Sequence, residues 1–324
     1  TGHIGYAHFE RDQDFESTGA YAYIGVDETE SDGVYGELSY RLNDRWSLTG
    51  GLRVQTEDQQ RDFDYISFGR SGTLDESKTI TLPKLVLQYD LNARTTIGLS
   101  AREGYNAPGG AFNFASSDYY HYDEETVRTF ELSVRSSTSD GHFDVRANAF
   151  YNDYDGYQAL NSDRAIINMD KAVTYGLEVE FNARLTDQLA LRGGLGLLET
   201  DITDGGENYA DADGNELNSA PPVTGNLGLT YSFPMGLELG VFAQYVDEYY
   251  GDVLNTDERV AGGYTLTSLS ANYYGNSWRI AAFVNNALDA DDYVVREPPG
   301  STAPEGYVAV LDPRSVGFSI TYDF

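Results

Sequence analysis

Apolar and polar residues alternate along most of this 324-residue chain. Between Thr174 and Leu185 every odd position is apolar, and every even position is small, polar or charged. The same split recurs around Trp46, Phe143 and Leu227. Successive side chains of a strand point to opposite faces of a sheet, so the pattern predicts strands with one apolar and one polar face. We find no convincing stretch with helical spacing, and therefore expect an all-β fold.

The predicted connections separate two kinds of all-β protein. Tight turns are expected at Asn43-Asp44, near Asn92-Ala93 and at Thr186-Asp187. Longer polar links are expected at 58–78, 106–124, 202–220, 249–262 and 289–313. A soluble β-sandwich usually mixes connection lengths at both ends, whereas short and long links that alternate are typical of a membrane barrel. The spacing favours a transmembrane antiparallel up-and-down β-barrel.

Segment lengths and composition agree with this interpretation. Most segments run about ten to fourteen residues, enough for a tilted strand to cross a bilayer, and we count about fourteen strands between His3 and the last segment at 314–324. No run approaches the roughly 18 apolar residues of a membrane helix. Aromatic residues near strand ends, such as Tyr40, Trp46 and Trp278, are predicted to lie at the headgroups.

Charge and cysteine content exclude several functions. The chain has 52 acidic and 21 basic residues, a formal net charge of -31, which argues against a nucleic-acid partner because phosphate binding needs clustered Lys and Arg. With 26 Tyr and 15 Phe, disorder is disfavoured. Cysteine is absent, so neither a disulfide framework nor a thiolate metal site can form.

Several short segments occur in a distinctive order along the chain. They are Gly51-Leu52-Arg53 before Glu57, the run from Arg102 to Gly110, Ala149-Phe150-Tyr151, Gly176-Leu177-Glu178, Ala220-Pro221-Pro222 and the run from Val284 to Asp289. The final strand adds alternating Val316, Phe318, Ile320, Tyr322 and Phe324. In this order the segments resemble the carboxyl-terminal barrel region of TonB-dependent outer-membrane receptors, and the final stripe is similar to the signal read by the barrel-assembly machinery.

This resemblance implies a multi-pass barrel in the outer membrane of a Gram-negative bacterium, in contact with outer-membrane lipid. It also implies TonB-driven uptake of a scarce or large ligand, such as a siderophore, haem, a corrinoid or a carbohydrate, without a resident cofactor. Family members have about 22 strands and an amino-terminal plug that contacts TonB. Nothing here looks like the plug, so residues 1–324 are expected to be one partial barrel, its carboxyl-terminal portion. A closed fourteen-stranded barrel, acting as a passive channel or a surface binding protein without energy coupling, is the alternative.

Tyrosines in two of the long links are the candidate ligand contacts. Aromatic faces beside amide and hydroxyl groups suit a sugar, a haem-like ring or a siderophore. The same rings could instead form the rim girdle or pack on one another. The candidates are Tyr105, Asn106, Tyr119, Tyr120, His121 and Tyr122 around the link 106–124, with Tyr249 and Tyr250 in a later link.

Other possible sites are weaker. Asp211, Asp213 and Asn215 resemble the start of a calcium loop, but the twelve-residue frame is not completed, and a solvated polar loop is the competing interpretation. The four histidines, His3, His8, His121 and His142, form no ligand cluster in sequence, and no G-x-S-x-G segment is present. We therefore predict no enzymatic activity. Polar-face charges such as Arg102, Glu131, Arg135, Arg146, Glu178 and Glu180 are expected to contact a plug or water.

Overall fold

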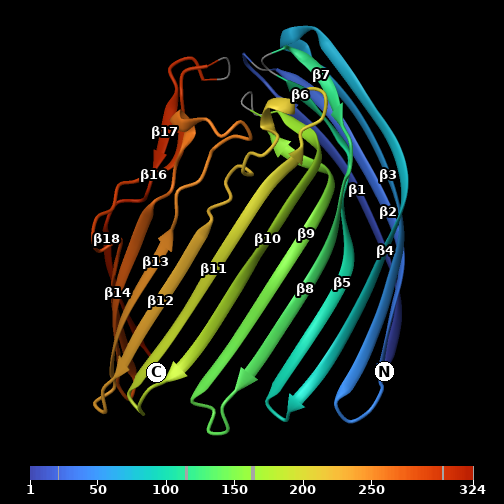
Figure 1. The fold of residues 1–324 in the computed structure, drawn as a ribbon. Coiled ribbons are helices and arrows are strands. Elements are labelled where there is room, and N and C mark those ends of the chain that lie inside the picture. The colour runs from blue at the N-terminus through green and yellow to red at the C-terminus, as the bar shows by residue number, and fades with distance from the viewer. Residues whose placement is uncertain (21, 114–115, 162–164, 301–302, 324) are drawn as a thin grey trace.

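A computed structural model of the chain shows one large antiparallel sheet of fourteen strands (Figure 1). It describes residues 1–324 except 21, 114–115, 162–164, 301–302 and 324. Each strand of the sheet pairs with its neighbour in chain order once two small hairpins are set aside. The strands are β1 (Gly2–Ser17), β2 (Tyr23–Arg41), β3 (Trp46–Tyr65), β4 (Arg70–Asn92), β5 (Thr95–Asn106), β8 (Glu125–Ser137), β9 (Phe143–Leu160), β10 (Ile166–Arg184), β11 (Leu189–Asp204), β12 (Val223–Ser232), β13 (Leu237–Val246), β14 (Tyr264–Tyr274), β15 (Trp278–Asn285) and β18 (Ser315–Tyr322).

The remaining elements are small. Two hairpins stand apart from the sheet, β6 (Gly109–Asn113) with β7 (Asp118–Tyr122), and β16 (Tyr293–Glu297) with β17 (Tyr307–Val310). Helix in the described residues is limited to three-residue 3-10 turns at Ile66–Phe68, Ala210–Ala212 and Asp257–Arg259. The all-β, up-and-down architecture and the strand count predicted from the sequence are confirmed.

Strands β1 and β18 are the two edges of the sheet. Across the described residues no ladder joins them, so the fourteen strands form a curved, open wall. The alternative of a closed fourteen-stranded barrel is therefore wrong for this structure. The predicted final strand is present as β18, and its Val316, Phe318, Ile320 and Tyr322 point outward and are exposed. Phe324 lies outside the described residues, and recognition of this stripe by the assembly machinery stays a prediction.

Short turns join the strands at one end of the sheet, as predicted. Asn43 explains one of them, because its Oδ1 accepts hydrogen bonds from the backbone N–H groups of Arg45 (2.9 Å) and Trp46 (3.0 Å). Asn92 acts in the same way on Arg94 (2.9 Å). These side-chain bonds fix the register of the hairpins on either side.

The opposite end departs from the prediction. Residues 58–78 are not a polar loop, because they continue β3 and β4 as a paired ladder up to the turn at Ile66–Phe68. The connections at 18–22 and 161–165 are also short, so short and long links do not strictly alternate. Strands β3 and β4, with 20 and 23 residues, exceed the expected length. The outward face of their outer parts is polar, so these residues were interpreted as a polar link.

The outward face carries an apolar band edged by aromatic rings. Leu52, Val54 and Leu85 lie within the band and are half exposed. Near the short turns, ring pairs mark its lower edge: Trp46 with Tyr89 (4.6 Å between centroids), Tyr231 with Phe233 (4.6 Å) and Trp278 with Tyr322 (4.5 Å). Rings at this height match the aromatic girdle of outer-membrane barrels. No helix in the described part of the chain has the length and hydropathy to cross a membrane.

Above the band the outer face becomes strongly acidic. We call the outward-facing side of β1–β4, from the level of His8 and Asp32 to the end of the sheet away from the short turns, the acidic outer wall. None of its outward-facing residues is Lys or Arg. This part of the surface therefore carries an uncompensated negative charge. Its carboxylates belong to Glu10, Asp12, Asp14, Glu16, Glu28, Glu30, Asp32, Asp58, Asp62, Asp64 and Asp75.

Candidate functional site

The β6–β7 hairpin folds against β3 and β4, at the end of the sheet away from the short turns (Figure 1). Inner-facing Tyr65, Leu74 and Ile80 are buried, although they lie above the apolar band. The Phe112 ring of β6 stacks on Tyr65 with centroids 3.9 Å apart. The link 106–124, predicted as a long polar connection, thus contains a paired hairpin at 109–113 and 118–122 that covers one side of the mouth.

A buried ion cluster holds this cover. Asp27, 1% exposed, accepts hydrogen bonds from Arg11 Nη2 (2.7 Å) and Arg61 Nε (2.7 Å). Arg61 Nη1 also donates to the carbonyl of Gly110 in β6 (2.8 Å). Burial opposes the charge on Asp27, but the two arginines outweigh it and lower the pKa of Asp27 below its ordinary value. Arg61 therefore links the sheet to the hairpin through its hydrogen bond to Gly110, while its ion pair with Asp27 holds the guanidinium in place.

Three of the predicted ligand residues fasten the hairpin to the wall. The Tyr119 ring lies directly over Gly72 of β4, with its buried hydroxyl lacking a partner among the described residues. The Tyr120 hydroxyl accepts a hydrogen bond from the backbone N–H of Ile166 in β10 (2.8 Å). His121 Nε2 lies 2.8 Å from the carbonyl of Thr73, which can only accept, so this nitrogen carries the proton. The hairpin thus bridges β4 and β10.

The other predicted residues of this region, Tyr105, Asn106 and Tyr122, differ in whether their polar side-chain atoms are buried or hydrogen-bonded. Burial, with Glu57 and Glu76 nearby, raises the pKa of Tyr105 to about 12, and its buried hydroxyl has no partner in the described chain. Asn106 Nδ2 donates to Gln158 Oε1 (2.9 Å). Tyr122 lies at the end of β7, and no hydrogen bond of its hydroxyl is found within the described residues. The Tyr122 hydroxyl thus differs from those of Tyr105 and Tyr119, which are buried without a partner.

Gly72→Ala tests how closely the β6–β7 hairpin packs against β4. A methyl group at Gly72 would overlap the Tyr119 ring, and overpacking of this kind costs about 1–3 kcal/mol. We expect the hairpin to lift from the wall and to become sensitive to proteinase K added to intact cells. Gly50→Ala on β3 is the matched control, because no atom lies within 4 Å of the added methyl. Equal protease resistance of the two variants would contradict this packing.

Tyr249 and Tyr250 lie in a second group of segments around the mouth. The Tyr249 hydroxyl donates to the carbonyl of Val294 in β16 (2.8 Å), and the Tyr250 carbonyl accepts from Ser219 N–H (2.8 Å). The structure thus ties these tyrosines to the connection 205–222 and to β16, and among the described residues no hydrogen bond joins them to the β6–β7 hairpin. The two predicted groups of tyrosines therefore occupy separate parts of the mouth.

A buried ion triad fixes this second group. Arg259, 9% exposed, bonds Glu297 of β16 at 2.7 and 2.8 Å and lies 3.3 Å from Asp252. Asp252 also accepts hydrogen bonds from Thr256 Oγ1 (2.8 Å) and Thr256 N–H (3.0 Å). The triad joins the connection 247–263 to the β16–β17 hairpin.

The connection 205–222 folds inward onto β10 and β11 and builds a small apolar core. Ile202 and Met169 from the sheet are fully buried against Leu217 and Val253. Within this connection, Asp213 accepts a hydrogen bond from Gly205 N–H (2.7 Å), and Asn215 donates to the Val253 carbonyl (3.0 Å). Two of the calcium candidates are thus used to hold the fold of the loop, and Asp211 lies in its 3-10 turn.

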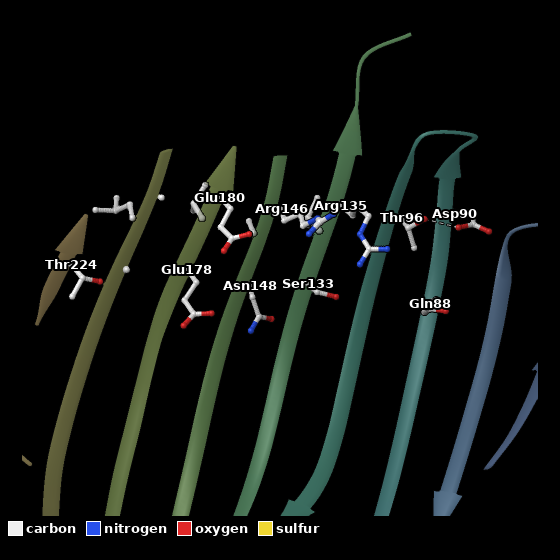
Figure 2. Close-up of a pocket in the computed structure, with 16 residues that line it drawn as sticks. Gln88, Asp90, Thr96, Ser133, Arg135, Arg146, Asn148, Glu178, Glu180 and Thr224 are labelled. Atoms are coloured by element: carbon white, nitrogen blue, oxygen red, sulfur yellow. Dashed lines mark hydrogen bonds between the residues drawn. The ribbon is translucent and has the colours of Figure 1, made fainter. Parts of the chain in front are cut away.

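The inner wall below the mouth forms a polar concavity of about 570 Å³. Arg135 on β8 and Arg146 on β9 stand directly opposite each other, with Glu178 and Glu180 on β10 beside them (Figure 2). Within the described chain none of these four charges has an ion-pair partner within 4 Å. By contrast, Arg102 and Glu131 nearby are paired at 2.8 Å. Arg135 and Arg146 are like charges opposite each other, which destabilises a sheet, and Glu180 is the cross-strand neighbour of Arg146 without closing an ion pair with it.

Sequence reasoning placed the polar-face charges correctly but missed Asp27, Arg61 and Arg259. Their partners lie across strands or in other connections, and no local motif marks them. Arg259 is a basic residue that follows several acidic residues in the sequence. In a chain this acidic, that arrangement did not distinguish it from other basic residues.

Comparison with known families decides the class of protein. The family described as "TonB dependent receptor-like, beta-barrel" matches residues 2–287. This chain belongs to the TonB-dependent receptor β-barrel family. The fourteen-stranded wall is therefore part of an outer-membrane barrel, and the apolar band is its lipid-facing surface.

Two curated relatives of this receptor barrel are similar along most of the chain. "Probable TonB-dependent siderophore receptor PiuA" of Acinetobacter baumannii is 23% identical over 70% of this chain and 32% of its own length. "Metal-pseudopaline receptor CntO" of Pseudomonas aeruginosa is 23% identical over 87% of this chain and 39% of its own length. The chain thus spans less than half the length of these curated relatives.

Solved structures share the fold of this receptor barrel. The siderophore receptor PiuA from Acinetobacter baumannii superposes with a TM-score of 0.77 at 19% identity, over 92% of this chain and 44% of that chain. The ferric yersiniabactin uptake receptor FyuA from Yersinia pestis gives 0.79 at 18% identity, over all of this chain and 50% of that chain. At these identities the likeness concerns the fold alone.

Proposed function

We propose that this chain is the carboxyl-terminal wall of a receptor that takes up a metal chelate of the siderophore class across the outer membrane, driven by TonB. The observation that carries the proposal is the family match, together with an inner wall on which four charged side chains form no ion pair within the described residues. Relatives named for siderophores and for metal-pseudopaline support the ligand class. The mouth adds aromatic surface suited to such a ligand.

Within the mouth, we propose that Tyr122 and Tyr250 contact the ligand. The neighbouring predicted residues hold the surrounding segments in place. The hydroxyls of both are without a hydrogen bond in the described residues. By contrast, the side chains of Tyr120, His121 and Tyr249 form hydrogen bonds with backbone groups of other strands. A phenol that is free to donate and accept can orient a polar chelate against an aromatic face.

The proposal is tested in cells that carry the full-length protein as their only receptor for a set of iron-loaded siderophores. We expect accumulation of radiolabelled iron that disappears when TonB is deleted. Uptake that persists without TonB would favour the passive channel, and binding without uptake would favour a surface binding protein. Either result overturns energy-coupled transport.

The unpaired charges of the inner wall support the proposal that this face receives a plug domain. A plug carboxylate between Arg135 and Arg146 would relieve their repulsion, and a plug cation would serve Glu178 and Glu180 in the same way. Wall glycines at positions 194 and 196 leave room for a close approach. Energy coupling would then act through this contact, because a plug must be held before it can be moved.

Arg135→Ala combined with Arg146→Ala should loosen the plug. We expect TonB-dependent uptake to fall about tenfold or more, since a charge-assisted contact in a water-poor interface contributes about 1.5–3 kcal/mol. Cells should also become sensitive to vancomycin, which a seated plug excludes. Arg279→Ala is the control, because Arg279 also faces inward but lies over the Tyr274 ring (5.5 Å). Unchanged uptake and vancomycin resistance in the double variant would contradict plug docking at this wall.

A further inference from the structure

Three side chains with metal-binding atoms meet on the outer surface of β1 and β2, away from the mouth and the inner wall. The antiparallel register places His8 directly opposite Asp32, and Glu30 stands diagonally across from His8. All three point to the outward face, because alternate residues of each strand share a face. One ligand atom from each lies within 4.8 Å of the others. His8 is far from Glu30 and Asp32 in the sequence, and only the register of β1 with β2 brings them together.

The local contacts prepare this group for a cation. His8 Nδ1 and Asp32 Oδ1 are 2.9 Å apart, and the Tyr6 hydroxyl donates to the same Asp32 oxygen. Glu10 Oε2 lies 4.0 Å from His8 Nε2. The surrounding acidic outer wall contains no outward-facing Lys or Arg, so no neighbouring side chain neutralises these carboxylates. The single imidazole is the sole nitrogen ligand within the described group, among oxygen donors.

The geometry is close to that of a bound ion. Zinc–nitrogen and zinc–oxygen bonds of about 2.0–2.2 Å allow two ligand atoms on one ion to lie at most about 4.2 Å apart. In the tetrahedral arrangement that zinc favours, neighbouring ligand atoms lie about 3.4 Å apart, so side-chain movements of about 1 Å close the group on an ion. His8 and Glu30 are exposed and free to make such movements, while the β1–β2 ladder holds their backbones in place.

From these observations we propose that His8, Glu30 and Asp32 bind a first-row divalent transition-metal ion of the zinc class, with water completing the coordination. Imidazole favours such ions over calcium and magnesium, which take oxygen ligands. The acidic outer wall raises the local cation concentration, and His8 provides the selectivity. Tyr6 is a positioning residue, because it orients Asp32 without being one of the three ligands. This site is independent of the proposed uptake function and uses none of its residues.

The test is zinc binding to the full-length protein in detergent, measured by calorimetry in millimolar Mg²⁺ to occupy the acidic outer wall. We expect one Zn²⁺ per chain and a Kd at least about tenfold weaker in His8→Ala. His142→Ala is the matched control, because His142 is equally exposed but lies beside one carboxylate, Asp140 (3.5 Å). Its zinc affinity should equal that of the native protein.

A second measurement protects the result against misfolding. Co²⁺ bound in place of Zn²⁺ should give visible absorption bands that weaken in both His8→Ala and Glu30→Gln, with folding checked by heat-modifiable migration in gels. If one variant does not fold, the other decides. Zinc binding that is unchanged in the folded variants, or that Mg²⁺ removes from the native protein, overturns the proposal.

Discussion

Asp27→Asn is expected to release the β6–β7 hairpin from the inner wall. The substitution leaves Arg11 and Arg61 facing an uncharged amide at a position that is 1% exposed. Removing one partner of a buried ion pair typically costs about 3–5 kcal/mol. Arg61 should then turn toward water and abandon the Gly110 carbonyl. Hydrogen exchange of residues 109–122 should accelerate about a hundredfold or more, because each 1.4 kcal/mol is a factor of ten.

The control for this prediction is Asp62→Asn. Asp62 adjoins Arg61 in β3, but it points outward, is exposed and belongs to the acidic outer wall. The same change of charge should there alter stability by less than about 0.5 kcal/mol. If Asp27→Asn left exchange of the hairpin at the native rate, Arg61 would not be what holds it. The ladder between β2 and β3 should keep its protection in both variants.

Arg259→Met should loosen two external segments at once. It leaves Asp252 and Glu297 as neighbouring buried carboxylates without their shared counter-charge. The expected local loss is again about 3–5 kcal/mol. Because the chain has no cysteine, single labels at Glu258→Cys and Glu305→Cys report on the two segments separately. The spin-label spectra of both positions should shift to high mobility.

Arg296→Met is the matched control for the triad. Arg296 is the residue before Glu297, and its guanidinium lies 5.2 Å from the centre of the Tyr293 ring. Its loss should cost about 0.5–1 kcal/mol and leave both labels ordered. Adding Glu297→Gln to Arg259→Met should restore part of the order, because it removes one of the stranded charges. A variant in which only one label became mobile would contradict a triad that couples the two segments.

Sequence alone predicted the parts of this fold in which one face of a strand is apolar. From Thr174 to Leu185 the alternation assigned each side chain to the correct face, and the strand count followed from repeats of the same pattern. The signal failed at residues 58–78. There Asp58 and Asp62 face outward above the lipid while Gln59 and Arg61 face inward, so both faces are polar and the period of two disappears.

The site was less predictable, because it depends on register and on inward folding. Tyrosines of the link 106–124 were recognised by type, but nothing in the sequence indicated that Tyr119 would pack on Gly72 or that Tyr120 would meet Ile166. The same holds for His8 and Asp32, which are 24 residues apart and become neighbours only when β1 and β2 are aligned. The calcium interpretation and the assembly signal stay predictions.

The two sides of the mouth are built by different means, and this determines how freely each can diverge. In the outer parts of β1–β4 the ladder of backbone hydrogen bonds supports the wall, so outward side chains add little to its shape. Around Arg259 the shape depends on individual side chains. Outward-facing residues of β1–β4 that are exposed to antibodies, phages and bacteriocins can therefore be substituted without changing the shape of the mouth. On the side of Arg259, substitutions that avoid recognition by such agents would also disrupt the side-chain contacts that shape the mouth.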